Sequence, residues 1–123
     1  MTPSTFKISS SIKLETRLGG VANPRWMALL ASIAGSGSIT AAAKAAGLSY
    51  KAAWDAIDAM NNLAGKPVVE TVVGGKGGGG AKLTPRGRKL LATYRIVEEE
   101  NARFLAGINS RLKHADRDLR VLD

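Results

Sequence analysis

Cysteine is absent from this sequence of 123 residues, and histidine occurs only once, at His114. Disulfide bonds and thiolate metal sites are therefore excluded, and a reducing cytoplasm is the compartment that fits best. A single histidine supplies neither a cluster of metal ligands nor a base beside a nucleophile. We therefore expect no metal, no cofactor and no catalytic site.

Long hydrophobic runs are also missing. No apolar stretch approaches the roughly 20 residues that a membrane span needs. The first residues lack the apolar core, roughly 7–15 residues long, of a secretory signal. The sequence therefore predicts a cytoplasmic protein with no membrane partner.

Negative charge is scarce. Ten Asp and Glu residues stand against 18 Lys and Arg, which gives a net charge of +8 and a pI of about 10.2. Residues 67–89 contain five of the basic residues and only one acidic residue, Glu70, so half of the excess lies in this stretch. A local excess of one sign is typical of a surface that contacts phosphates, and double-stranded DNA is the partner that we expect.

Two helical runs separated by a short turn occupy the middle of the chain. The first is expected over residues 40–46 and the second over residues 49–64. Gly47 is placed to end the first helix in the left-handed conformation. Two helices joined by about three residues have the spacing of a helix-turn-helix, here at about 38–64, whose second helix enters the major groove of DNA.

Capping residues mark the other helix starts. Asn23-Pro24 predicts a helix that continues to about Gly35, and Thr84-Pro85 begins a long helix that reaches about Leu112. Either Ser38 or Thr40 caps the first helix of the helix-turn-helix.

The remaining segments have the character of strands. Alternating apolar and polar residues predict a strand within 6–18, which Gly19-Gly20 closes. The run 68–73 is the most strand-like in the chain, and a glycine-rich stretch connects it to a short strand at 81–83. The fold class is therefore expected to be mainly α with a small β-hairpin wing (α+β). The expected organisation is a winged helix-turn-helix domain over 1–84 with its wing at about 68–83, a long dimerisation helix over 85–112 and a charged tail over 113–123.

The glycine-rich stretch admits a second interpretation. Residues 75–80 fit the glycine spacing of a dinucleotide-binding loop, which would favour a nucleotide-binding enzyme. That loop works only between a strand and a helix, whereas a second strand is expected to leave this one. A wing whose bare glycines and Lys76 approach a phosphate is the interpretation that we favour.

The outward face of the second helix carries the candidate contacts with DNA. If Ala53, Ile57 and Met60 point inward, Tyr50, Lys51, Trp54, Asp55 and Asp58 point away from the core. Trp54 contacts a base or sugar, or is partly core. Asp55 either accepts a hydrogen bond from a cytosine amino group or forms a salt bridge with Lys51 four residues away. The complete set expected to contact DNA also includes Ser38, Thr40, Lys44, Ser49, Lys76, Gly77, Gly78, Lys82 and Arg86.

The last predicted helix has a stripe of apolar residues at alternating spacings of four and three. A helix of this length spans about 40 Å, more than a small domain covers, although the stripe could also pack on its own domain. The exposed part is therefore expected to pair with the same helix of a second chain, giving a homodimer. The residues expected at the dimer contact are Leu90, Tyr94, Val97, Asn101, Phe104, Leu105, Ile108 and Leu112.

Several of these motifs together resemble the ModE family of bacterial transcription regulators, whose DNA-binding domain is related to the LysR type. The resemblance covers roughly residues 5–112 and rests on Ser49-Tyr50-Lys51-Ala52-Ala53-Trp54-Asp55-Ala56, on the glycine wing 74–80, and on 83–91. It implies a transcriptional regulator that binds a pseudo-palindromic operator as a homodimer. Two alternatives remain: an architectural DNA-binding protein, or an adaptor that forms a heterodimer with a related regulator.

Full-length members of that family continue into C-terminal domains that bind molybdate. The residues after Leu112 are too few to form such a domain, so the chain is expected to lack direct molybdate binding.

Overall fold

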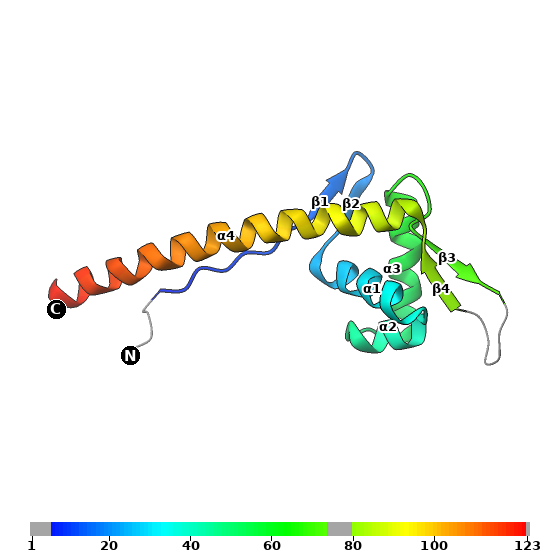
Figure 1. Ribbon diagram of the computed structural model, residues 1–123, viewed down its shortest axis with the longest axis horizontal. Helices are drawn as coiled ribbons and strands as arrows, with labels where there is room; N and C mark the ends of the chain where they lie inside the picture. Colours follow the sequence, from blue (N-terminus) through cyan, green and yellow to red (C-terminus); the bar gives the residue numbers. More distant parts are fainter. Residues whose placement is uncertain (1–5, 74–79, 123) are drawn as a thin grey trace. The chain divides into compact units, whose positions relative to one another are not determined.

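The computed structural model describes residues 6–73 and 80–122. Three helices, a hairpin and a further helix follow one another as expected, so the mainly helical fold with a small wing is confirmed (Figure 1). The elements are β1 (Leu14–Thr16), β2 (Gly19–Ala22), α1 (Pro24–Ser36), α2 (Ile39–Ala45), α3 (Tyr50–Leu63), β3 (Val69–Val72), β4 (Gly80–Leu83) and α4 (Pro85–Leu122).

The chain divides into two compact units. Residues 13–95 form the winged-helix unit, and the N-terminal residues up to Ile12 form the second unit with the part of the chain from Ile96 onward. Helix α4 therefore contributes its beginning to one unit and its remainder to the other.

The N-terminal strand differs from the prediction. Residues 6–13 are not in a strand, and the short strand β1 pairs with β2 as an antiparallel hairpin. Gly19-Gly20 does not close the strand but begins β2, with Gly19 at a φ of 135° that favours glycine. From the local sequence, two adjacent glycines predict the end of a strand. Whether they instead belong to the second strand of a hairpin depends on the strand that pairs with them.

Helix α1 begins as the sequence predicts. The side chain of Asn23 accepts a hydrogen bond from the Trp26 backbone nitrogen at 2.9 Å, and Pro24 occupies the first helical position. Trp26 is only half-buried, whereas Met27 beside it is 3% exposed and lies in the core.

Helices α2 and α3 form the expected helix-turn-helix. Ser38 caps α2 by accepting from the Ala41 nitrogen at 3.1 Å, while Thr40, the other candidate, lies within the helix. Gly47 has a φ of 70°, which reverses the chain after α2 in the left-handed conformation expected for it. Ser49 then caps α3.

Strands β3 and β4 form the antiparallel base of the wing, with Val69 opposite Leu83 and Val72 opposite Gly80. This base is attached to the end of α1, because the Ala81 nitrogen donates to the carbonyl oxygen of Gly37, the C-cap of α1, at 3.0 Å. A Cβ at Gly80 would lie 2.8 Å from that same oxygen, so the close approach of the two backbones requires glycine.

Helix α4 starts against the other side of the wing. Thr84 caps it by accepting from the Gly87 nitrogen at 3.0 Å, and the Thr84 nitrogen donates to the Val68 carbonyl oxygen at 3.0 Å. The helix does not end at Leu112 but continues to Leu122, so the expected tail from residue 113 is helical through that residue.

The core of the winged-helix unit collects apolar side chains from every one of its helices and from both wing strands. Its largest fully buried side chains are Tyr94, Leu29, Leu30, Ile33, Ile57, Met60 and Val68. Ala53 is also fully buried, so the inward face predicted for α3 is confirmed.

In the second unit, the extended residues 6–12 are hydrogen-bonded to side chains of α4. The Ile8 nitrogen donates to Asn109 Oδ1 at 3.3 Å, and Ser10 Oγ donates to Asn101 Oδ1 at 2.9 Å. Polar side chains of the helix thus accept hydrogen bonds from this segment.

Candidate nucleic-acid interface

The N-terminal end of α3 combines a capped helix start with an outward surface. Ser49 Oγ accepts from the Ala52 nitrogen at 3.0 Å, and Ala53, Ala56, Ile57 and Met60 hold the opposite face of the helix in the core. The cap and the buried face therefore fix both the position and the rotation of the helix, which determines the side chains that it presents to solvent.

Two aromatic side chains lie on one flank of that surface. The rings of Tyr50 and Trp54 meet edge to face, with centroids 6.3 Å apart and planes at 82°. Tyr50 is 56% exposed and Trp54 is half-buried, so the indole is partly core and partly surface. The pair offers an apolar edge of the kind that contacts sugars and thymine methyl groups.

An ion pair lies beside the aromatic pair. Lys51 Nζ is 3.0 Å from Asp55 Oδ2, and the two side chains are 87% and 63% exposed. The structure thus contains the salt bridge that was one of the two interpretations of Asp55. Asp58, one turn further along α3, is exposed as predicted.

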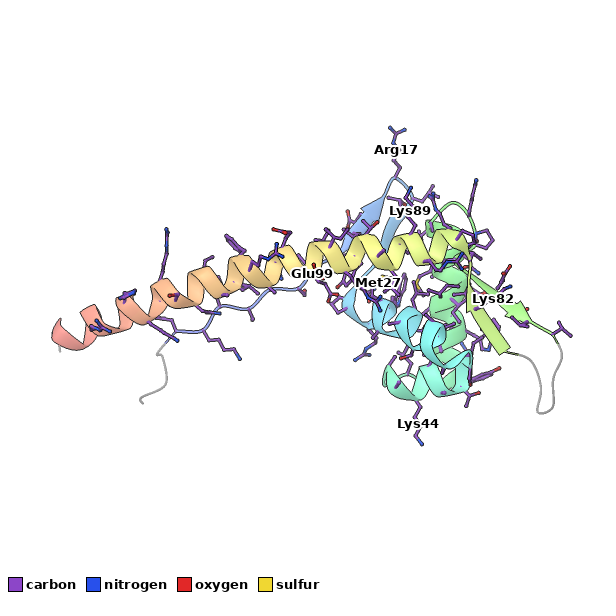
Figure 2. All side chains as sticks on the ribbon, in the orientation of Figure 1. Arg17, Met27, Lys44, Lys82, Lys89 and Glu99 are labelled. Atoms are coloured by element: carbon purple, nitrogen blue, oxygen red, sulfur yellow. The ribbon has the colours of Figure 1, made fainter. Side chains whose placement is uncertain are left out.

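Helix α2 adds polar groups to the same unit. Thr40 and Lys44 are exposed, whereas the Ser38 hydroxyl is used as the N-cap. Figure 2 shows the Lys44 side chain pointing away from α1 and α3. A lysine at the end of a short helix is free to reach a phosphate, and it also complements the helix dipole.

The wing contributes one basic residue that the structure describes. Lys82 on β4 is paired with Glu70 on the opposite strand, with Nζ and Oε1 3.4 Å apart, and its side chain is 64% exposed. The candidates Lys76, Gly77 and Gly78 lie outside the described residues.

Arg86 is exposed at the start of α4, and its contact with DNA stays a prediction. Its guanidinium donates to the carbonyl oxygen of Ala64, which follows α3, at 2.7 Å. This is the C-terminal end of a 14-residue helix, about 20 Å from its N-terminal end at 1.5 Å per residue. The contact is non-local, so no sequence pattern around Arg86 indicates it.

Tyr94 corrects the expected dimer contact. Its ring is only 1% exposed in the single chain, because it packs in the core of the winged-helix unit, and it cannot also contact a partner. Leu90, Val97, Leu105, Ile108 and Leu112 are half-buried. Asn101 is hydrogen-bonded to Ser10 of its own chain.

Two aromatic or aliphatic side chains of α4 are conspicuously exposed. Phe104 is 62% exposed, and Ile96 is 63% exposed although it lies outside the predicted stripe. Phe104, Gly107, Ile108 and Arg111 line a shallow hollow on this part of the helix. Ile96 was missed because the alternating spacing of four and three skips its position.

Two further absences apply to the described part of the chain. Among residues 6–73 and 80–122, no group of three His, Asp or Glu side chains is arranged to hold a metal ion. No helix among them combines the length and the apolar character that crossing a bilayer requires.

A family comparison covers this interface. The model described as the bacterial regulatory helix-turn-helix protein, lysR family, matches residues 24–88, which is more than half of the chain. The match extends from α1 through the helix-turn-helix and the wing into the first turn of α4.

Individual relatives resemble the chain over most of its length. It is 51% identical over 96 residues to the molybdenum-pterin-binding protein MopB of Rhodobacter capsulatus, covering 78% of this chain and 36% of that protein. It is 46% identical over 112 residues to the molybdenum transport protein ModE of Azotobacter vinelandii, covering 91% of this chain and 41% of that protein.

A third relative is described as a regulator. The chain is 48% identical over 93 residues to the DNA-binding transcriptional dual regulator ModE of Escherichia coli (strain K12), covering 76% of this chain and 35% of that protein. The chain therefore spans well under half the length of the curated relatives it matches.

Proposed function

Because the chain belongs to the lysR family of bacterial regulatory helix-turn-helix proteins, with a helix-turn-helix region of the ModE type, we propose that it regulates transcription by binding a pseudo-palindromic operator as a homodimer. The chain is a DNA-binding helix-turn-helix unit and not an enzyme. In the proposal, α3 enters the major groove and the wing contacts neighbouring phosphates.

The outward face at the start of α3 is the observation that carries the proposal. Its aromatic pair and its ion pair are displayed to solvent on a helix whose opposite face is fixed in the core. A helix that reads base edges needs both exposed polar or aromatic side chains and a fixed position. Each good contact with a base contributes roughly 1–3 kcal/mol, and this contribution is lost when the side chain is misplaced. Exposed Lys44 and Lys82 lie on neighbouring elements, where they supply charge for phosphates.

The second part of α4 supports the homodimer. Phe104 is largely exposed, and Ile108 and Leu112 are half-buried in the single chain. Covering such side chains with the same helix of another chain removes apolar surface from water at roughly 25 cal/mol per Å². A two-fold symmetric dimer then presents two copies of α3 to two half-sites.

A charge placed in the apolar stripe tests this arrangement. We expect Ile108→Glu to weaken the dimer by at least about tenfold, because an unpaired carboxylate would have to be buried. Operator affinity should fall about 100-fold or more, since each half-site would be bound without a linked partner. Sedimentation equilibrium measures the first effect. DNase footprinting on an operator selected from random duplex DNA with the wild-type chain measures the second.

The matched control is Ala106→Glu, which places the same charge on an exposed position of the same helix, 200° around the axis from Ile108 at 100° per residue. It should leave both measurements unchanged. A wild-type chain that is monomeric at micromolar concentration would contradict the homodimer. Protection without a discrete site would favour the architectural alternative, and a dimer formed only with a related regulator would favour the adaptor.

A further inference from the structure

The ion pair between Lys51 and Asp55 lies on the most outward part of α3. At 100° per residue, these two positions are roughly opposite the buried Ala53, Ile57 and Met60. Both side chains belong to the first two turns, which are the turns that a recognition helix inserts into the groove. Their position is therefore that of residues that meet base edges.

Helix stability does not account for this pair. Lys51 is 87% exposed and Asp55 is 63% exposed, so water screens their attraction and the pair contributes little to folding. A carboxylate on a surface that approaches phosphates is also repelled by them. A role for Asp55 as a hydrogen-bond acceptor towards DNA therefore explains its position better than a contribution to the stability of α3.

The geometry of the pair matches the edge of a G·C base pair. Lys51 Nζ, a donor, and Asp55 Oδ2, an acceptor, are 3.0 Å apart. In the major groove, guanine O6 is an acceptor and cytosine N4 is a donor. These two atoms are hydrogen-bonded to each other and hence lie about 3 Å apart. The lysine and the carboxylate thus form the complementary pair at the same spacing.

An A·T base pair also has a donor beside an acceptor, but its neighbouring groups fit less well. The thymine methyl group lies next to the O4 acceptor that Lys51 would need, and the adenine N7 acceptor lies next to the amino group that Asp55 would need. The methyl group would crowd the ammonium, and N7 would repel the carboxylate. Guanine instead gives Lys51 a second acceptor in N7.

We propose that Lys51 and Asp55 together read one G·C base pair in each half-site, with Lys51 on guanine and Asp55 on cytosine. This inference rests on the proposed function, because it requires α3 to lie in the major groove. The carboxylate acts partly by exclusion, since it repels an acceptor such as thymine O4 in the place of cytosine N4. The ion pair holds the two side chains in register before DNA is bound.

The experiment first selects binding sites from random duplex DNA with the wild-type chain. Affinity is then measured for all four base pairs at every position of the half-site, for wild type, Asp55→Asn and Lys51→Ala. We expect the preference for G·C over the other base pairs, measured as a ratio of affinities, to fall about tenfold in both variants at one and the same position. The preferences at all other positions should be unchanged. Because the two residues act on one base pair, the double variant should lose less than the product of the two single effects.

Two controls remove the same charges elsewhere. Glu99→Gln and Lys66→Ala change exposed residues outside α3. They should alter the overall affinity for DNA only through the change of one unit in net charge, equally for all sequences, and leave every base preference intact. Circular dichroism of each variant checks that the helical content of the chain is unchanged.

The outcomes separate this inference from the function on which it rests. If the wild-type chain selects no discrete site, the proposed function itself fails. If it selects a discrete operator but the two variants change different positions, or none, the function stands and the assignment of Lys51 and Asp55 to one G·C pair is overturned.

Discussion

One face of the first turns of α4 is buried in the winged-helix unit, whereas the remainder of the same helix is largely exposed in the single chain. The same stripe of regularly spaced apolar residues runs through both parts. Before residue 96, Gly87, Leu91 and Tyr94 are buried in the winged-helix unit. From Ile96 onward, no side chain among those described is fully buried, and Phe104 is largely exposed. A periodic stripe therefore identifies an apolar face but does not identify the surface that covers it.

The largest expected effect comes from truncating the aromatic side chain on each side of this division. Tyr94→Ala should lower the free energy of unfolding by about 3–5 kcal/mol, because it empties a fully buried site. Phe104→Ala should change the unfolding of the winged-helix unit by less than about 0.5 kcal/mol, because its ring lies mostly in solvent. Urea denaturation followed by tryptophan fluorescence measures this unit, since Trp26 and Trp54 both lie within it. Equal losses for the two variants would contradict the division.

An intermediate effect, with opposite signs in the two parts, is expected for the glycines of α4. A Cβ at Gly87 would lie 2.1 Å from the Val68 carbonyl oxygen, so Gly87→Ala should destabilise the protein by about 1–3 kcal/mol through overpacking. Gly107 has nothing within 4 Å of an added Cβ, so Gly107→Ala should stabilise its helix by about 0.5–1 kcal/mol. Thermal unfolding followed at 222 nm records both shifts. A stabilising Gly87→Ala would show that α4 does not approach the backbone of Val68 this closely.

The smallest effect concerns the N-terminal segment. Asn101→Ala removes the acceptor for Ser10 Oγ, and this exposed hydrogen bond should contribute no more than about 1 kcal/mol. Amide hydrogen exchange should therefore become faster at residues 6–12 while the winged-helix unit stays unchanged. Faster exchange throughout the chain would mean that the two parts unfold together.

Local signals predicted the helices well. Asn23, Thr84 and, of the two candidates for α2, Ser38 are N-caps in the structure as predicted. Such caps can be predicted because a capping side chain acts on backbone groups only two or three residues away. The strands were predicted less well. Residues 6–13 alternate like a strand, yet Ile8 and Ser10 donate to the side chains of Asn109 and Asn101 on α4.

The candidate site was predictable to the extent that it depends on α3 alone. The periodicity of that helix identified its inward face, and four-residue spacing identified the pair of Lys51 with Asp55. Two contacts were not predictable: Arg86 donates to the carbonyl oxygen of Ala64, 22 residues away, and Tyr94 is buried in the core of its own unit and not on an exposed face of α4. Contacts of this kind depend on how the elements pack together, so no regular residue spacing in the sequence indicates them.

The hydrogen bond from the Ala81 nitrogen to the Gly37 carbonyl oxygen has a consequence for how such a regulator diverges from its relatives. It joins the wing to the end of α1, directly before the helix-turn-helix, through main-chain atoms, so side-chain replacements that keep Gly80 leave it in place. Substitutions of the outward residues of α3 leave this attachment of the wing unchanged. A descendant can acquire a preference for different bases without acquiring a differently spaced footprint, so its regulatory targets can change one substitution at a time.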